Sequence, residues 1–153
     1  MRRVLSGVLS ALLLGGQAFA GPGQEFADWA AELQSEAYSR ASIAARMPAA
    51  DAQPLDIEDP FYFELEQFAA DAMRLSRLLA DHGGPQDLQC IFRGMSADAE
   101  ARLEALNAAE RQSEQARIYR AIADLMRDAS EIGPAVDDSE IAVEGLPTCP
   151  SRP

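Results

Sequence analysis

The sequence predicts an all-α fold, a small bundle of four to five helices whose C-terminal tail is tied back by one disulfide. Apolar residues recur every three or four positions over long stretches, which is the spacing of one face of a helix. Prolines and glycines gather between these stretches, where they end helices. The chain has 153 residues, enough for one domain of ordinary size, and only two cysteines, Cys90 and Cys149.

Residues 1–20 have the features of a secretory signal peptide. Arg2 and Arg3 form a positive start, residues 4–16 are apolar, and the segment ends in Ala18-Phe19-Ala20, a small-residue pattern that signal peptidase cleaves. The apolar run, about 13 residues, is shorter than the ~20 needed to span a bilayer, which disfavours a membrane anchor. We expect cleavage after Ala20 and export, with the bacterial periplasm as the compartment.

The first helix is expected from residue 25 to about residue 47. Its apolar residues repeat at helical spacing, and many are alanines, so a neighbouring helix can approach closely. A linker at 48–59, which contains Pro48 and Pro54, prevents the helix from continuing. The residues expected on the buried face are Phe26, Trp29, Leu33, Ala37, Ala41 and Ala44.

The second helix has the clearest predicted boundaries. Asp59 can accept hydrogen bonds from free backbone N–H groups as the N-cap, and Pro60 suits the first helical position. His82 ends the helix, and Gly83 and Gly84 can take up the left-handed conformation that follows a helix. Between these ends, an apolar seam is expected to face the bundle core. The seam consists of Phe61, Leu65, Phe68, Ala72, Leu75 and Leu79.

The stretch 85–132 can be divided into helices in more than one way. We expect a short helix at 85–94 that closes near Gly94, followed by a helix capped by Ser96. Residues 97–132 contain no Gly or Pro, but their apolar positions change face around a polar segment at 107–115. Either one long helix exposes its middle or the chain turns near 107–113. The turn is favoured because a helix of ~36 residues would be about 54 Å long.

After the leader, the chain divides into a helical bundle domain at 21–134 and an acidic, proline-containing tail at 135–153. Two cysteines in an oxidising compartment pair with each other by default, so we expect a Cys90–Cys149 disulfide. This bridge would pin the tail across the bundle, and closing so long a loop stabilises a fold by about 4 kcal/mol at most. The alternative is an intermolecular bridge or a reactive thiol.

The chain is strongly acidic, with a net charge of −12 and arginine as its only basic residue besides one histidine. A nucleic-acid-binding protein needs a cationic face, so that class is disfavoured. No stretch after the leader approaches membrane-spanning length, so we expect no stable membrane insertion. The charge would instead speed association with a basic protein partner.

The sequence carries no recognisable catalytic constellation, and we expect no enzyme, no metal and no cofactor. It lacks a Gly-x-Ser-x-Gly elbow and a Cys-x-x-Cys-His haem motif, and one histidine cannot supply the two Glu-x-x-His motifs of a di-iron site. We expect that histidine, His82, to cap a helix C-terminus, where a cation is favoured. The alternative is a haem or metal ligand, with a methionine as the second haem ligand. The candidate methionines are Met47, Met73, Met95 and Met126.

Three consecutive aromatic residues open the second predicted helix. One helix face cannot bury all of them, because successive side chains point about 100° apart. Phe61 belongs to the seam, so Tyr62 or Phe63 either packs under the linker or meets a partner. Acidic residues surround these rings, which suits a basic protein partner. The candidate partner-binding residues are Glu58, Asp59, Tyr62, Phe63 and Glu66.

These observations predict an exported, soluble, non-catalytic protein-binding module, in an inhibitor, immunity-type, chaperone-like or envelope-accessory role. The alternative is a carrier that holds haem, a metal or a small ligand in the bundle core. The two hypotheses differ at His82, which the carrier would need as a ligand and the binding module would not.

Overall fold

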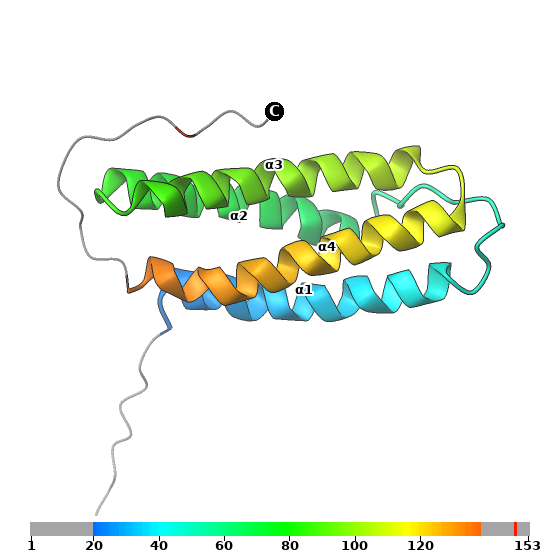
Figure 1. Ribbon diagram of the computed structural model, residues 1–153, viewed down its shortest axis with the longest axis horizontal. Coiled ribbons are helices and arrows are strands. Elements are labelled where there is room, and N and C mark those ends of the chain that lie inside the picture. The colour runs from blue at the N-terminus through cyan, green and yellow to red at the C-terminus, as the bar shows by residue number, and fades with distance from the viewer. Residues whose placement is uncertain (1–19, 139–148, 150–153) are drawn as a thin grey trace, which may run out of the picture.

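The computed structural model describes residues 20–138 and Cys149 (Figure 1). These residues form four α-helices, α1 (Pro22–Ala44), α2 (Pro60–Asp81), α3 (Gln86–Ala108) and α4 (Gln112–Ile132), followed by the 3-10 helix η1 (Gly133–Val136). The predicted all-α bundle is confirmed. The predicted signal peptide up to Phe19, and the tail residues 139–148 and 150–153, lie outside the described residues. No helix of the described part has both the length and the apolar character needed to cross a membrane.

The helices alternate in direction along the bundle (Figure 1). α1 packs mainly against α4, and α2 packs mainly against α3. The first and last helices are therefore neighbours, although α2 and α3 separate them in the sequence. The bundle consists of two antiparallel pairs, which we call the α1–α4 pair and the α2–α3 pair.

Aromatic rings join the two pairs. The ring of Phe26 on α1 stacks on that of Phe68 on α2, with centroids 4.9 Å apart, and meets the edge of Phe92 on α3 at 5.8 Å. Trp29 lies 6.3 Å from Phe68 and is only partly buried. All residues of the predicted α2 seam are buried, so that prediction is confirmed. The buried face of α1 is rich in alanine, as expected, and includes Ala27, Ala30, Ala37, Ala41 and Ala44.

The start of α1 is fastened to the end of the bundle domain. Gly21 offers no side-chain cap, and the carboxylate of Asp137 accepts hydrogen bonds from the backbone N–H groups of Gly23 (3.0 Å) and Gln24 (2.8 Å) instead. A Cβ on Gly23 would collide with the backbone oxygen of Gly133, so the close approach of these two segments requires glycine. A distant carboxylate thus caps α1 and favours the positive end of its dipole.

The linker between α1 and α2 is hydrogen-bonded to the turn between α3 and α4. The amide of Ala52 donates to the carbonyl of Glu110 (2.9 Å), and the amides of Gln112 and Ser113 donate to the carbonyls of Ala50 (3.0 Å) and Pro48 (3.2 Å). Gln112 and Ser113 are in the first turn of α4, whose N–H groups have no acceptor within the helix. The linker therefore supplies the acceptors that the start of α4 needs.

Several predicted helix ends are confirmed. Asp59 accepts a hydrogen bond from the amide of Phe61 (2.9 Å) and caps α2, with Pro60 at its start. Gly83 has a φ of 69°, the left-handed conformation expected after this helix. The chain also turns between α3 and α4, so the favoured prediction of a turn near 107–113 is correct.

The prediction of a separate short helix at 85–94 is wrong. α3 continues from Gln86 to Ala108, so Gly94 does not end a helix, and Ser96 is a buried residue inside α3 rather than an N-cap. Glycine costs a helix interior only about 1 kcal/mol. Burial of Phe92 alone contributes about 1.5–3 kcal/mol, so packing outweighs the local preference of Gly94.

Two other predicted boundaries shift. α1 covers Pro22–Ala44 rather than 25–47, and its earlier start is capped by Asp137 from the other end of the domain. The bundle also extends beyond residue 134, since Val136 in η1 is buried against it and Asp137 forms the cap. The first residues assigned to the tail therefore belong to the folded bundle.

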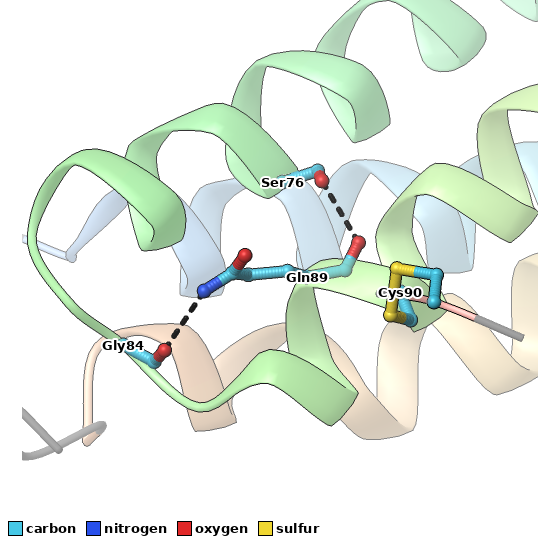
Figure 2. The surroundings of a disulfide bond; sticks show 5 residues. Ser76, Gly84, Gln89 and Cys90 are labelled. Carbon is cyan, nitrogen blue, oxygen red and sulfur yellow. Dashed lines mark hydrogen bonds between the residues drawn. A yellow bond between two sulfur atoms is a disulfide. The ribbon is translucent and has the colours of Figure 1, made fainter. Parts of the chain in front are cut away.

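Cys90 and Cys149 form the predicted disulfide, with their Cα atoms 5.5 Å apart (Figure 2). Cys90 follows Gln89 on α3, in a segment that is tied to α2. The buried hydroxyl of Ser76 donates to the carbonyl of Gln89 (2.8 Å), and the side-chain amide of Gln89 donates to the carbonyl of Gly84 (2.9 Å). The disulfide thus attaches the tail to the α2–α3 pair.

Candidate functional site

The predicted partner-binding residues lie at the start of α2, on different sides of the helix. Glu58 is exposed in the turn before α2, and Asp59 faces α1. Tyr62 and Glu66 both line a groove between α2 and α3, while 63% of the Phe63 surface is exposed. Phe63 and Glu66 are three residues apart and are neighbours on the helix surface. The structure therefore brings Tyr62, Phe63 and Glu66 together and directs Asp59 elsewhere.

Asp59 belongs to an ion pair inside the fold. The guanidinium of Arg40 on α1 donates to both carboxylate oxygens of Asp59, at 2.7 and 2.8 Å, and its Nε donates to Glu36 at 2.7 Å. The same guanidinium lies 4.8 Å from the centroid of the Phe61 ring. A bidentate ion pair of this kind fixes the relative positions of its two side chains. Asp59 therefore holds α1 against the start of α2, and its carboxylate is already occupied.

The Arg40 cluster stays in its usual charge state at neutral pH. Hydrogen bonding to Arg40 holds the pKa of Asp59 below its ordinary value, although partial burial opposes the effect. Burial acts to lower the pKa of Arg40, but its hydrogen bonds to Asp59 and Glu36 raise it above its ordinary value. Burial also raises the pKa of the Tyr119 phenol, which lies beside Arg40. These shifts favour a structural ion pair rather than a proton-transfer site.

A groove of about 910 Å³ runs between α2 and α3. On α2 it extends from Tyr62 to Arg77, a length of about 22 Å at the rise of an α-helix. Small side chains lie along its middle, namely Ala69 and Ala70 on α2 and Ser96 on α3. Larger apolar side chains stand near its ends. The complete lining is Tyr62, Leu65, Glu66, Ala69, Ala70, Met73, Arg77, Ser96, Glu100, Leu103, Glu104 and Asn107.

The rims of this groove are acidic. Glu66 on α2 and both Glu100 and Glu104 on α3 are exposed. Within the described part of the chain, none of these three carboxylates forms an ion pair; Arg77 is the basic residue of the lining and lies at its α2 C-terminal end. The groove therefore combines apolar side chains with a negative potential that attracts cations.

A second, smaller groove of about 310 Å³ lies on the other side of α2, against α1. Its lining includes Trp29, Glu32 and Glu36 from α1 and Glu64 from α2. The start of α2 is consequently acidic on both flanks, although only the α2–α3 groove contains predicted site residues.

His82 lies exposed at the C-terminal end of α2, where it was expected to act as a cap. It lines a small pocket of about 220 Å³ together with Asp137. Met126 is fully buried, whereas Met47 is 64% exposed. Within residues 20–138 and 149, no group of three or more His, Cys, Asp and Glu side chains is placed to hold a metal ion. His82 thus lies at one end of the bundle and not in the core, where the carrier hypothesis needs it.

The sequence does not single out Glu100, Glu104 or Arg40 as site residues. The first two are four residues apart, which places them on one face of a helix. Only the packing of α3 on α2 shows that this face borders Tyr62 and Glu66. No local pattern links Arg40 to Asp59, because they lie on different helices and meet only when the bundle closes.

Comparisons with known protein families, with curated proteins and with solved structures find no match for this chain. A candidate site must therefore be identified from the geometry of the described residues. Among them, the surface formed by Tyr62, Phe63, Glu66 and the adjoining groove has the features expected of a protein-binding site: an exposed aromatic ring, a concave and partly apolar surface and acidic rims.

Proposed function

We propose that the protein is an exported, soluble, non-catalytic module that binds a basic protein partner through the surface formed by Tyr62, Phe63, Glu66 and the α2–α3 groove. The observation that carries this proposal is the position of Phe63, an exposed aromatic ring next to the acidic α2–α3 groove. Aromatic residues that a partner buries are frequent anchors of protein interfaces. Phe63 would be the anchor, Tyr62 would line the adjoining groove, and Glu66 would attract the basic partner.

The charge of the whole chain supports the same partner chemistry. A net charge of −12 repels acidic proteins and accelerates encounter with basic ones, more strongly at low salt. The signal-peptide pattern and the Cys90–Cys149 disulfide support an oxidising compartment, for which we propose the bacterial periplasm. An inhibitor, immunity-type, chaperone-like or envelope-accessory role would use this surface in the same way.

The test is capture of partners from the periplasmic fraction of the source cells. We would compare the wild-type protein with Phe63→Ala and with Ile43→Ala, which removes an apolar side chain that is 58% exposed on α1. Burial of a phenylalanine contributes about 1.5–3 kcal/mol, so Phe63→Ala should weaken partner binding by about ten-fold or more. Ile43→Ala should retain the partner. Equal recovery by both variants, with both folded by circular dichroism, would refute the proposed surface.

A further inference from the structure

We infer that the partner presents a basic amphipathic α-helix that lies lengthwise in the groove between α2 and α3. This inference depends on the proposed function and specifies which element of the partner the groove receives. The relevant features are the walls of the groove, its dimensions and the charges on its rims.

The walls favour a helix over an extended segment. Both walls are α-helices, so their backbone N–H and C=O groups are already bonded within α2 and α3. A segment that binds as an added β-strand needs a strand edge with which to pair, and this groove provides none. A helix satisfies its own backbone hydrogen bonds and needs only side-chain contacts.

The dimensions of the groove fit about four helical turns. The lining of α2 from Tyr62 to Arg77 matches a partner helix of about 15 residues. The middle of the groove is lined by the small residues Ala69, Ala70 and Ser96, which leave room for a partner helix. The axes of packed helices lie about 8–10 Å apart, so the partner helix can approach most closely there. We expect apolar partner residues at spacings of three and four to contact these positions.

The rim charges set the composition of the partner helix. Glu66 stands on one side, and Glu100 and Glu104 on the other, so basic residues should flank the apolar stripe on both sides. Arg77 lies at the opposite end of the α2 wall from Tyr62. Because the positive end of a helix dipole is its N-terminus, the partner helix should point its N-terminus towards Tyr62 and its C-terminus towards Arg77. A second copy of this acidic chain does not fit, since like charges would face each other across the groove.

The probe for this inference is a synthetic helix of about 18 residues, built from leucines on one face and lysines on both flanks. The control peptide has the same composition in a scrambled order that has no apolar face. Binding of each fluorescent peptide to the complete protein would be measured by anisotropy at physiological salt, and the binding site would be mapped by NMR chemical shifts.

Two matched pairs of variants separate the groove from general charge attraction. Ala70→Lys places bulk and positive charge in the groove, whereas Ala101→Lys makes the same change at an exposed position of α3 outside its lining. Glu100→Gln/Glu104→Gln removes the two negative charges of the α3 rim. Glu25→Gln/Glu131→Gln removes the same charge from exposed positions on α1 and α4.

We expect the amphipathic peptide to bind about ten-fold tighter than the scrambled peptide. Each groove variant should lose about ten-fold in affinity for the amphipathic peptide, whereas its control should lose less than two-fold. Shift changes should cluster on the groove residues of α2 and α3. The helix-in-groove inference would be overturned if the two peptides bound equally well, or if neither bound. It would also be overturned if the Glu100/Glu104 variant and its Glu25/Glu131 control lost affinity equally, or if the shift changes centred on the α1–α2 groove. None of these outcomes decides the proposed function, because a natural partner could still be captured through Phe63.

Discussion

The two helix pairs use small residues for different purposes. In the α1–α4 pair, alanines line the buried face of α1, and Gly23 brings the backbone of α1 into contact with Gly133, which follows α4 at the start of η1. In the α2–α3 pair, Ala72 and Ala99 are fully buried in the same way, but the buried Ala69 and the exposed Ala70 also line the α2–α3 groove. A small residue that faces a neighbour closes an interface, whereas one beside an open groove leaves space for a ligand. The first pair therefore closes the fold, and the second offers a surface.

The largest expected effect concerns the core that joins the two pairs. Phe68→Ala should lower the free energy of unfolding by about 3–5 kcal/mol, because it removes a fully buried ring that stacks on Phe26. Phe63→Ala, five residues earlier on the same helix, should change it by less than about 0.5 kcal/mol, because the ring is exposed. Chemical denaturation measures both values. A large loss for Phe63→Ala would show that this ring supports the fold and is not an anchor.

The disulfide, which attaches Cys149 to α3 of the α2–α3 pair, should stabilise the fold. Replacing Cys90 and Cys149 with alanine should lower the free energy of unfolding by about 2–4 kcal/mol, because the unfolded chain loses the constraint of a long loop. Reductant should destabilise the wild-type protein and leave the double variant unchanged. Labelling of the unfolded, unreduced protein with a thiol reagent should find no free cysteine. One or two labelled thiols per chain would contradict the intrachain bridge.

The α1–α4 pair should be sensitive to a single methyl group at its glycine contact. Gly23→Ala should cost about 1–3 kcal/mol, because the new Cβ meets the backbone of Gly133, which cannot rotate away as a side chain would. The same substitution at Gly94, inside α3 and only partly buried, should stabilise the protein by about 0.5–1 kcal/mol. Thermal unfolding of both variants provides the comparison, and a neutral Gly23→Ala would show that the two backbones are not in close contact.

The smallest predicted effect is a pH dependence at the ion pair between α1 and α2. The pKa of Asp59 is lower in the folded protein than its ordinary value of 3.8. Its contribution to stability is therefore complete above that value and is lost as the pH falls through the folded pKa. At neutral pH, Asp59→Asn should cost about 1–2 kcal/mol, and this cost should shrink progressively as the pH falls below 3.8. Asp56→Asn, in the exposed linker before α2, is the control. A cost that does not change with pH would show that the charge of Asp59 is unimportant.

Features that depend on the local order of residues can be predicted from the sequence. The α2 seam from Phe61 to Leu79 and the Asp59 cap follow from periodicity and helix-start chemistry, and both are confirmed. The cap of α1 by Asp137 could not be predicted in this way, because it forms only after α4 returns to α1. Gly94 misleads for a related reason: its helix-breaking preference is local, whereas packing of α3 on α2 keeps it helical.

The candidate site likewise combines residues that local order identifies with residues that only helix packing identifies. Tyr62, Phe63 and Glu66 could be selected from the sequence because they follow one another at the start of a helix. The opposite rim, Glu100 and Glu104, depends on how α3 lies against α2. The charge of Asp59 indicates a binding residue, but within the fold its carboxylate is bound by Arg40. Which of these residues can bind a partner and which support the fold therefore follows only from the arrangement of the helices.

The most direct test of partner binding is native mass spectrometry of the protein purified from its own source after chemical cross-linking in the cells. We predict a chain that begins at Gly21, carries an oxidised cysteine pair, and occurs in a complex with a second, basic polypeptide. A chain that carries only a haem or metal mass would contradict this account and favour the carrier hypothesis. A chain with no added mass, even after cross-linking, would contradict partner binding.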